Sequence, residues 1–178
     1  MSEASARTGA LVVAIPSADA LFADARFPSD ADGPGAPPHV TIVAPFAVPD
    51  ALTPNEAARL QLAISGLAPF DAAFGAVRRF DNGTAWLAPN DPEPFRQLTA
   101  AVAEAFPAWP PSRGEHAEVI PHLTLAAGAR AEQAEALARE ALPLEQRVTT
   151  VTYGSYSAEP GSWRTARTFR LIGRLRAL

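Results

Sequence analysis

The stretches Pro38-His39-Val40-Thr41-Ile42 and Pro121-His122-Leu123-Thr124-Leu125 follow one pattern: a proline, a histidine, an apolar residue, a threonine and a second apolar residue. The chain contains three histidines, and two of them occupy equivalent positions in this repeat. Alternate side chains of a β-strand point to opposite faces. We therefore expect each stretch to be a strand that presents an imidazole and a hydroxyl on one face and apolar side chains on the other.

A strand and a short helix are expected before the first stretch. The apolar run 10–15 is typical of a buried strand. Residues 17–25 have apolar side chains at helical spacing, with Ser17 in the position of an N-cap. The first motif itself predicts a strand over 39–44 that ends at Pro45.

A helix and a pair of strands are expected after the first stretch. Thr53, followed by proline and then by glutamate three residues on, has the pattern of a capping box, which predicts a helix over 54–65 closed by Gly66. Residues 69–80 and 84–90 alternate as two antiparallel strands joined by a tight Asp-Asn-Gly turn.

The second half of the chain repeats this order. Its expected elements are a helix over 92–106, a strand over 118–126, a helix over 131–141, and strands over 146–157 and 163–172.

Each histidine stretch also follows a loop rich in proline, over 28–38 and over 107–116. We infer two related lobes within a single domain spanning residues 1–178, in which residues 1–9 form a flexible tail.

Composition excludes several classes of protein. Without cysteine the chain has no disulfide and no thiolate chemistry, and without lysine it cannot form a lysyl adenylate for ATP-dependent ligation. A net charge of −4 argues against a protein that coats duplex DNA. No apolar run approaches the roughly 18 to 20 residues of a membrane span. We expect a cytoplasmic monomer that needs no cofactor.

Two imidazoles and two hydroxyls on facing strands suit phosphodiester cleavage. An imidazole has an ordinary pKa of about 6.5, so one of a pair can accept a proton while the other donates one. Threonine hydroxyls can hold the phosphoryl oxygens. A metal site built on His116, Glu118 and His122 is the weaker interpretation, because alternate strand positions lie about 6.5 to 7 Å apart and converge poorly on one ion.

In its paired His-x-Thr-apolar motifs and its order of elements, the sequence resembles the two-histidine phosphoesterase superfamily, which includes 2′-5′ RNA ligase-like proteins and cyclic phosphodiesterases. The resemblance runs from ALVVAI (10–15) to WRTARTFRLIG (163–173). It implies an α+β, bilobal fold: two pseudo-symmetric lobes of antiparallel sheet, with helices outside and a metal-independent site in the cleft between them. It also implies RNA ends or small nucleotides as substrates, cleaved at 2′,3′-cyclic phosphate or 2′-5′ phosphodiester groups.

The resemblance assigns roles to four matching positions. His39 and His122 would be the catalytic acid and base, in an order that the sequence leaves open, and Thr41 and Thr124 would bind phosphate. Many relatives carry an arginine or an aromatic residue where this chain has Ala127, so their other substrate contacts are not transferred.

Other aromatic and cationic residues could line a substrate pocket, or could equally be packing or solvated residues: Trp163, Arg164, Phe46, Tyr153, Tyr156, Arg78 and Arg79. Trp163 and Arg164 together could supply a stacking face and a phosphate-binding cation. Two alternatives to an enzyme remain open at this point. One is a non-catalytic RNA-end or nucleotide-binding module with the same fold, and the other is an interaction domain with a closed cleft.

Overall fold

The computed structural model describes residues 6–27, 35–111 and 119–173. Part of the expected tail, most of the first expected loop, residues 112–116 of the second expected loop, and Glu118 at the start of the expected strand over 118–126 lie outside this range. The first strand begins at Thr8, inside the stretch expected to be a tail. None of the helices in the described ranges combines the length and apolarity needed to cross a bilayer.

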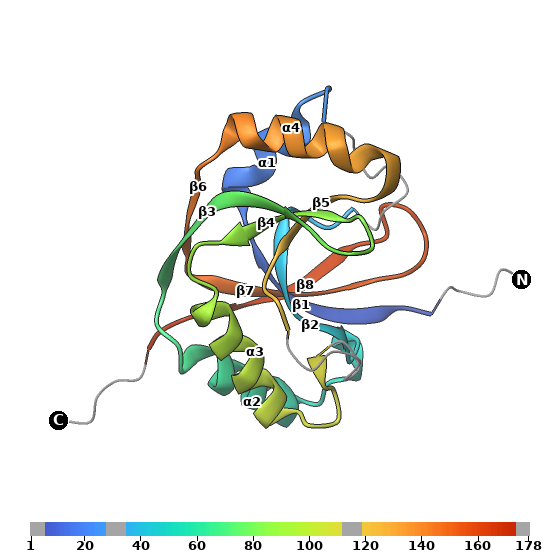
Figure 1. Cartoon of the computed structure of the whole chain (residues 1–178). Coiled ribbons are helices and arrows are strands. Elements are labelled where there is room, and N and C mark those ends of the chain that lie inside the picture. Colours follow the sequence, from blue (N-terminus) through green and yellow to red (C-terminus); the bar gives the residue numbers. More distant parts are fainter. Residues whose placement is uncertain (1–5, 28–34, 112–118, 174–178) are drawn as a thin grey trace, which may run out of the picture.

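The described strands form one antiparallel sheet in the order β6-β3-β4-β5-β2-β1-β7-β8 (Figure 1). In chain order they are β1 (Thr8–Ala14), β2 (His39–Phe46), β3 (Phe70–Arg79), β4 (Ala85–Pro89), β5 (Leu123–Ala126), β6 (Leu144–Val148), β7 (Thr150–Tyr156) and β8 (Arg164–Arg170). The expected α+β fold is confirmed.

The two motif strands lie at the centre of the sheet. Val40 of β2 pairs with Leu123 of β5, and this contact joins the half-sheet β2-β1-β7-β8 to the half-sheet β5-β4-β3-β6. The repeat seen along the sequence does not map directly onto these halves. The β3–β4 hairpin follows the first motif in the chain but completes the half-sheet of the second, and β7–β8 does the reverse.

Two pairs of helices cover the apolar face of the sheet at its two ends (Figure 1). The helices are α1 (Asp19–Ala23), α2 (Pro54–Ser65), α3 (Glu93–Ala105) and α4 (Ala131–Ala141). Thr99 of α3 donates a hydrogen bond of 3.1 Å to the carbonyl of Ile42 in β2. The buried core includes Val40, Ile42, Leu123 and Leu125. The motif histidines and threonines therefore belong to the opposite face.

Local signals predicted the helices well, with one exception. The capping box at Thr53 is present, because its hydroxyl accepts from the Glu56 N–H at 3.3 Å and the Glu56 carboxylate accepts from the Thr53 N–H at 2.8 Å. The prediction that Ser17 caps a helix is wrong. Pro16 opens a 3₁₀ turn that contains Ser17, and α1 begins only after it, with Ala18 in the N-cap position.

Three predicted strand boundaries are also wrong. Pro45 does not end β2, because it lies in an irregular part of the β1–β2 ladder, between the paired residues Val43 and Phe46, where its missing N–H is tolerated. The strand β5 begins only at Leu123.

The third corrected boundary concerns the strand expected over 146–157, which is two strands, β6 and β7, separated only by Thr149. β6 pairs with β3 at one end of the strand order, and β7 pairs with β1 and β8 at the other end. Because a single residue connects β6 to β7, the sheet curls and its two ends approach each other. This curl makes the sheet a half-barrel.

Candidate active site

The central pairing of Val40 with Leu123 places all four motif side chains together. The two strands run antiparallel, so the residues on either side of this contact also lie opposite each other. His39 is opposite Thr124, and Thr41 is opposite His122. His39 and His122 are then diagonal neighbours, about 7 to 8 Å apart at the backbone. The two imidazoles are therefore neighbours on one face of the sheet.

Both imidazoles are held by the same local hydrogen bond. Nδ1 of His39 lies 2.7 Å from the carbonyl oxygen of Pro37, and Nδ1 of His122 lies 2.7 Å from the carbonyl oxygen of Ile120. A carbonyl can only accept, so Nδ1 of each ring carries the proton and donates it. In each neutral ring Nε2 therefore has the lone pair, which is free to take or return a proton.

The His39 ring is easier to keep neutral than an ordinary histidine. Burial lowers the pKa of His39, and the nearby charge of His122 lowers it further, while the hydrogen bond to Pro37 acts in the opposite direction. These effects together favour the neutral form of His39.

The two motif threonines have hydroxyls available for a ligand. Thr124 is exposed and Thr41 is half-buried. Across residues 6–27, 35–111 and 119–173, no side-chain hydrogen bond joins either hydroxyl to another residue. Each hydroxyl could therefore donate to a phosphoryl oxygen without breaking an internal contact.

Trp163 lies beside His39. The two rings are nearly parallel, with an interplanar angle of 13° and ring centroids 6.5 Å apart. The indole lies over Gly154 of β7, where a Cβ atom would come within 2.5 Å of it. Its N–H donates to the Thr165 hydroxyl at 3.1 Å, which holds the ring in place. The structure thus brings Trp163 to the site.

A pair of stacked aromatic residues lies beside His122, and the sequence did not predict it. Phe80 and Trp86 stack at 4.7 Å between centroids, and their rings lie 5.0 and 5.8 Å from the imidazole of His122. Trp86 pairs with Thr124 across β4 and β5, so the two share a face. The alternation of the hairpin was visible in the sequence, but its pairing with the second motif was not.

Arg164 and Phe46 do not reach the histidines. Arg164 pairs with Ser155 and lies on the opposite face from Trp163, in a small pocket that Arg7 and Asp50 also line. Phe46 is a core residue, 2% exposed.

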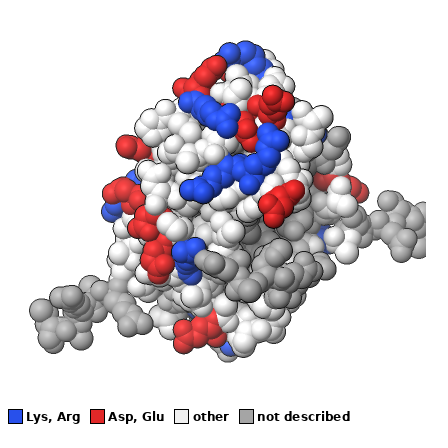
Figure 2. All heavy atoms as spheres, viewed as in Figure 1, with Lys and Arg blue, Asp and Glu red and all other residues white. Residues whose placement is uncertain are grey.

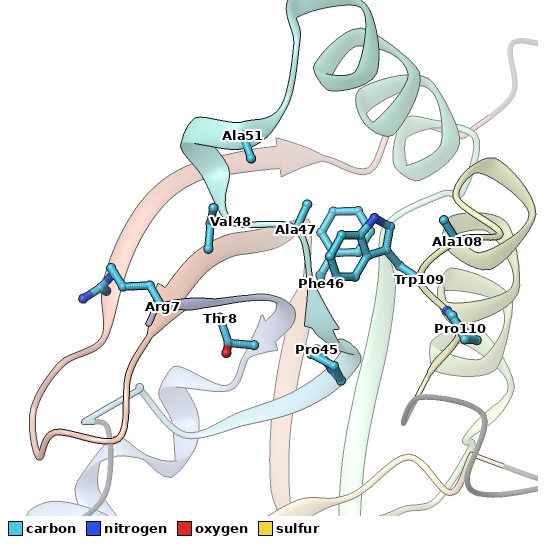
Figure 3. Close-up of a pocket in the computed structure, with 10 residues that line it drawn as sticks. All are labelled: Arg7, Thr8, Pro45, Phe46, Ala47, Val48, Ala51, Ala108, Trp109 and Pro110. Carbon is cyan, nitrogen blue, oxygen red and sulfur yellow. The ribbon is translucent and has the colours of Figure 1, made fainter. Parts of the chain in front are cut away.

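Phe46 and its neighbour Trp109 line a pocket of about 630 Å³ (Figure 3). None of the four motif residues lines this pocket. Tyr153 is buried against the same core and donates a 2.7 Å hydrogen bond to the carbonyl of Ala47, so it too serves packing.

The side-chain groups that the four motif residues offer to a ligand are two imidazoles and two hydroxyls. Within the described residues no three His, Cys, Asp or Glu side chains gather as a metal-binding group. His116 and Glu118, the partners of the alternative metal interpretation, lie outside those residues.

A sequence model of the 2′-5′ RNA ligase superfamily matches residues 15–159, which include both motifs. The chain belongs to this superfamily of two-histidine phosphoesterases. No curated protein matches the sequence.

Several solved structures superimpose on most of this chain. Escherichia coli LigT complexed with 3′-AMP superimposes with a TM-score of 0.60 at 17% identity, over 93% of this chain and 98% of LigT. TT0787 of Thermus thermophilus gives 0.60 at 18% identity, over 94% and 99%. A structure described only as a phosphoesterase gives 0.59 at 18% identity, over 93% and 99%. At these identities the likeness shows that this superfamily member shares their fold.

Proposed function

We propose that this chain is a metal-independent phosphodiesterase that hydrolyses 2′,3′-cyclic phosphate or 2′-5′ phosphodiester bonds in RNA ends or small nucleotides. One observation carries the proposal. The two motif imidazoles, diagonal neighbours across the central strand pair, are each anchored through Nδ1 and keep Nε2 for chemistry. We place a phosphate group between them, so that each ring can serve one side of the phosphorus atom.

The lowered pKa of His39 suits it to the role of general base. Its Nε2 accepts a proton from the water that attacks phosphorus, and a bond forms between the water oxygen and phosphorus. His122, in its protonated form, donates from Nε2 to the ribose oxygen that leaves as the phosphorus–oxygen bond breaks. The products are a phosphomonoester and a free hydroxyl. Exchange of one proton at each ring with solvent then restores the starting state.

The threonines and the imidazolium stabilise the charge of the transition state. Thr41 and Thr124 flank the same position from opposite strands, so each hydroxyl can donate to a different non-bridging oxygen. Negative charge grows on these oxygens during attack, which strengthens the hydrogen bonds relative to the ground state. These two residues would therefore raise turnover more than they raise affinity.

Trp163 is proposed to hold a base or ribose on the His39 side of the phosphate, in substrates that have a nucleoside on each side of it. Its ring lies parallel to the imidazole of His39 and beside the site, and aromatic faces commonly stack with unpaired bases. LigT, which shares the fold, was solved in complex with 3′-AMP and with NADP+. Arg164 and Phe46 are left out of the proposal, because one lies on the other face and the other is buried in the core.

The proposal is tested on a panel of substrates with EDTA present. The panel consists of adenosine 2′,3′-cyclic phosphate, 2′-5′-linked diadenosine and its 3′-5′-linked isomer, with products identified by chromatography against authentic 2′- and 3′-AMP. Hydrolysis of either of the first two substrates in EDTA is the expected result. Activity that EDTA abolishes would contradict the mechanism. Binding of these nucleotides without turnover would indicate a non-catalytic nucleotide-binding module instead.

A further inference from the structure

The β-sheet register places an arginine in line with the second motif. Arg78 of β3 pairs directly with Trp86 of β4, and Trp86 pairs with Thr124 of β5. Directly paired residues on antiparallel strands point to the same face. Arg78, Trp86 and Thr124 therefore form a row on the face that carries His122.

The neighbouring arginine points the other way and is already occupied. Nε of Arg79 lies 2.8 Å from the carboxylate of Glu135 in α4, which also pairs with Arg139 at 3.1 Å. Figure 2 shows cations and carboxylates intermixed over the upper end of the molecule, the end where α1 and α4 lie in Figure 1. Arg26, Arg79 and Arg139 each take part in an ion pair of the protein itself.

Arg78 lies on the opposite face from Arg79 and does not share its ion pair with Glu135. Its side chain is exposed. Counting only partners in the described parts of the chain, it makes no hydrogen bond and no ion pair. A guanidinium left in this state can form two parallel hydrogen bonds to a phosphate without losing an internal contact.

The distance along the row suits a second group of the same substrate. Neighbouring strands lie about 4.7 to 4.9 Å apart, so the backbone of Arg78 is about 9.5 Å from that of Thr124. The stacked rings of Phe80 and Trp86 occupy the space between them, beside His122. Trp86 is buried and Phe80 is half-buried, so a sugar and base lying on the Phe80 ring would carry their next phosphate toward Arg78.

We propose that Arg78 binds a second phosphate of the substrate, one nucleoside away from the phosphate held between His39 and His122. The preferred ligands would then be nucleotides that carry an additional 5′-phosphate or continue into an oligonucleotide. This inference rests on the proposed function, because it takes the motif residues as the site of the first phosphate.

The proposal is tested by binding, which needs no turnover. Calorimetry would compare adenosine 3′-phosphate with adenosine 3′,5′-bisphosphate on the wild-type chain, on Arg78→Gln and on the matched control Arg79→Gln. Loss of a charge-assisted contact is worth about tenfold in affinity. We expect the wild type and Arg79→Gln to bind the bisphosphate about tenfold more tightly than the monophosphate, and Arg78→Gln to lose most of this preference.

A third ligand identifies the source of the second phosphate. The dinucleotide adenylyl-(3′→5′)-adenosine 3′-phosphate offers a phosphodiester in place of the terminal 5′-phosphate. Tighter binding of the dinucleotide than of adenosine 3′-phosphate, lost in Arg78→Gln, would point to an oligonucleotide, and preference for the bisphosphate alone would point to a terminal phosphate. Equal binding of all three ligands by the wild type, or an unchanged preference in Arg78→Gln, would overturn the proposal. A chain that shows the preference but hydrolyses nothing would refute the proposed function and leave the role of Arg78 intact.

Discussion

Val40 and Leu123 pair across the centre of the sheet, each immediately after a motif histidine. Both side chains are fully buried on the helix-covered face. The pair therefore fixes the relative position of the two imidazoles from the opposite face of the sheet, where it would not contact a ligand. The proposed catalytic arrangement would therefore depend on packing at this point as well as on the motif residues.

Weakening this pair should affect activity beyond its effect on stability. Leu123→Ala removes buried apolar volume and should lower the free energy of unfolding by about 2 to 5 kcal/mol. Leu60→Ala, in the buried face of α2, should cost a similar amount and serves as the control. Activity per folded molecule, with the folded fraction taken from urea denaturation, should fall in Leu123→Ala and stay near wild type in Leu60→Ala. Equal activity in the two variants would count against a positioning role.

Replacing the motif threonines should reduce turnover and leave the fold intact. Thr124→Val and Thr41→Val keep the side-chain shape but remove the hydroxyl. Loss of a hydrogen-bond donor to a developing oxyanion typically costs about 10²- to 10³-fold, so kcat for adenosine 2′,3′-cyclic phosphate should fall by about 10²-fold in each. Thermal denaturation should show little change for Thr124→Val, because that side chain is exposed. A rise in KM at unchanged kcat would mean that the hydroxyls act in ground-state binding alone.

The titration of His39 should differ from that of an ordinary histidine. Burial and the charge of His122 lower the pKa of His39, so NMR should place it below about 6.5. Replacing His122 by glutamine removes one of these causes and should raise the pKa of His39. If His39 is the base, the acid limb of the kcat/KM profile should fall at this same lowered pKa. A pKa of His39 at or above the ordinary value would contradict the assignment.

The same shift predicts how stability depends on pH. Because the pKa of His39 is lower in the folded chain than in the unfolded chain, the unfolded chain binds the proton more readily. The contribution of His39 to the free energy of unfolding is therefore complete above about pH 6.5 and is lost as the pH falls through the folded-state pKa. Urea denaturation at several pH values should show this loss, and His39→Gln should lack that component.

Gly154 supports the position of Trp163 by leaving room for it. A Cβ atom at this position would lie 2.5 Å from the indole and 2.8 Å from the carbonyl oxygen of Arg164. Gly154→Ala should therefore displace Trp163 from the site and cost about 1 to 3 kcal/mol of stability. The measurements are urea denaturation and KM for 2′-5′-linked diadenosine, which has a nucleoside on each side of its phosphate; this KM should rise. Unchanged KM would argue against a substrate-binding role for Trp163.

The sequence predicted the central strands and most helices because their signals are local. Alternation within each Pro-His-x-Thr stretch placed His39 with Thr41 and His122 with Thr124, and the capping box at Thr53 marked the start of α2. The exchange of hairpins between the half-sheets could not be predicted in this way. It depends on pairings between distant strands, which local periodicity does not encode.

The same limit explains the site residues that were missed. Phe80 and Trp86 become neighbours of His122 only because the β3–β4 hairpin pairs with β5. Arg164 was grouped with Trp163 because they are adjacent in sequence, yet adjacent strand residues point to opposite faces.

The most direct test of the two-histidine mechanism is the kcat/KM for adenosine 2′,3′-cyclic phosphate in EDTA, measured for the wild type, His39→Ala, His122→Ala and the double variant. Each proton transfer is typically worth about 10²- to 10⁴-fold, and groups that act as a unit are not additive. Each single variant should therefore lose at least about 10²-fold, and the double variant should lose little more than the less active single variant. Activity within tenfold of wild type in either folded single variant would contradict the account.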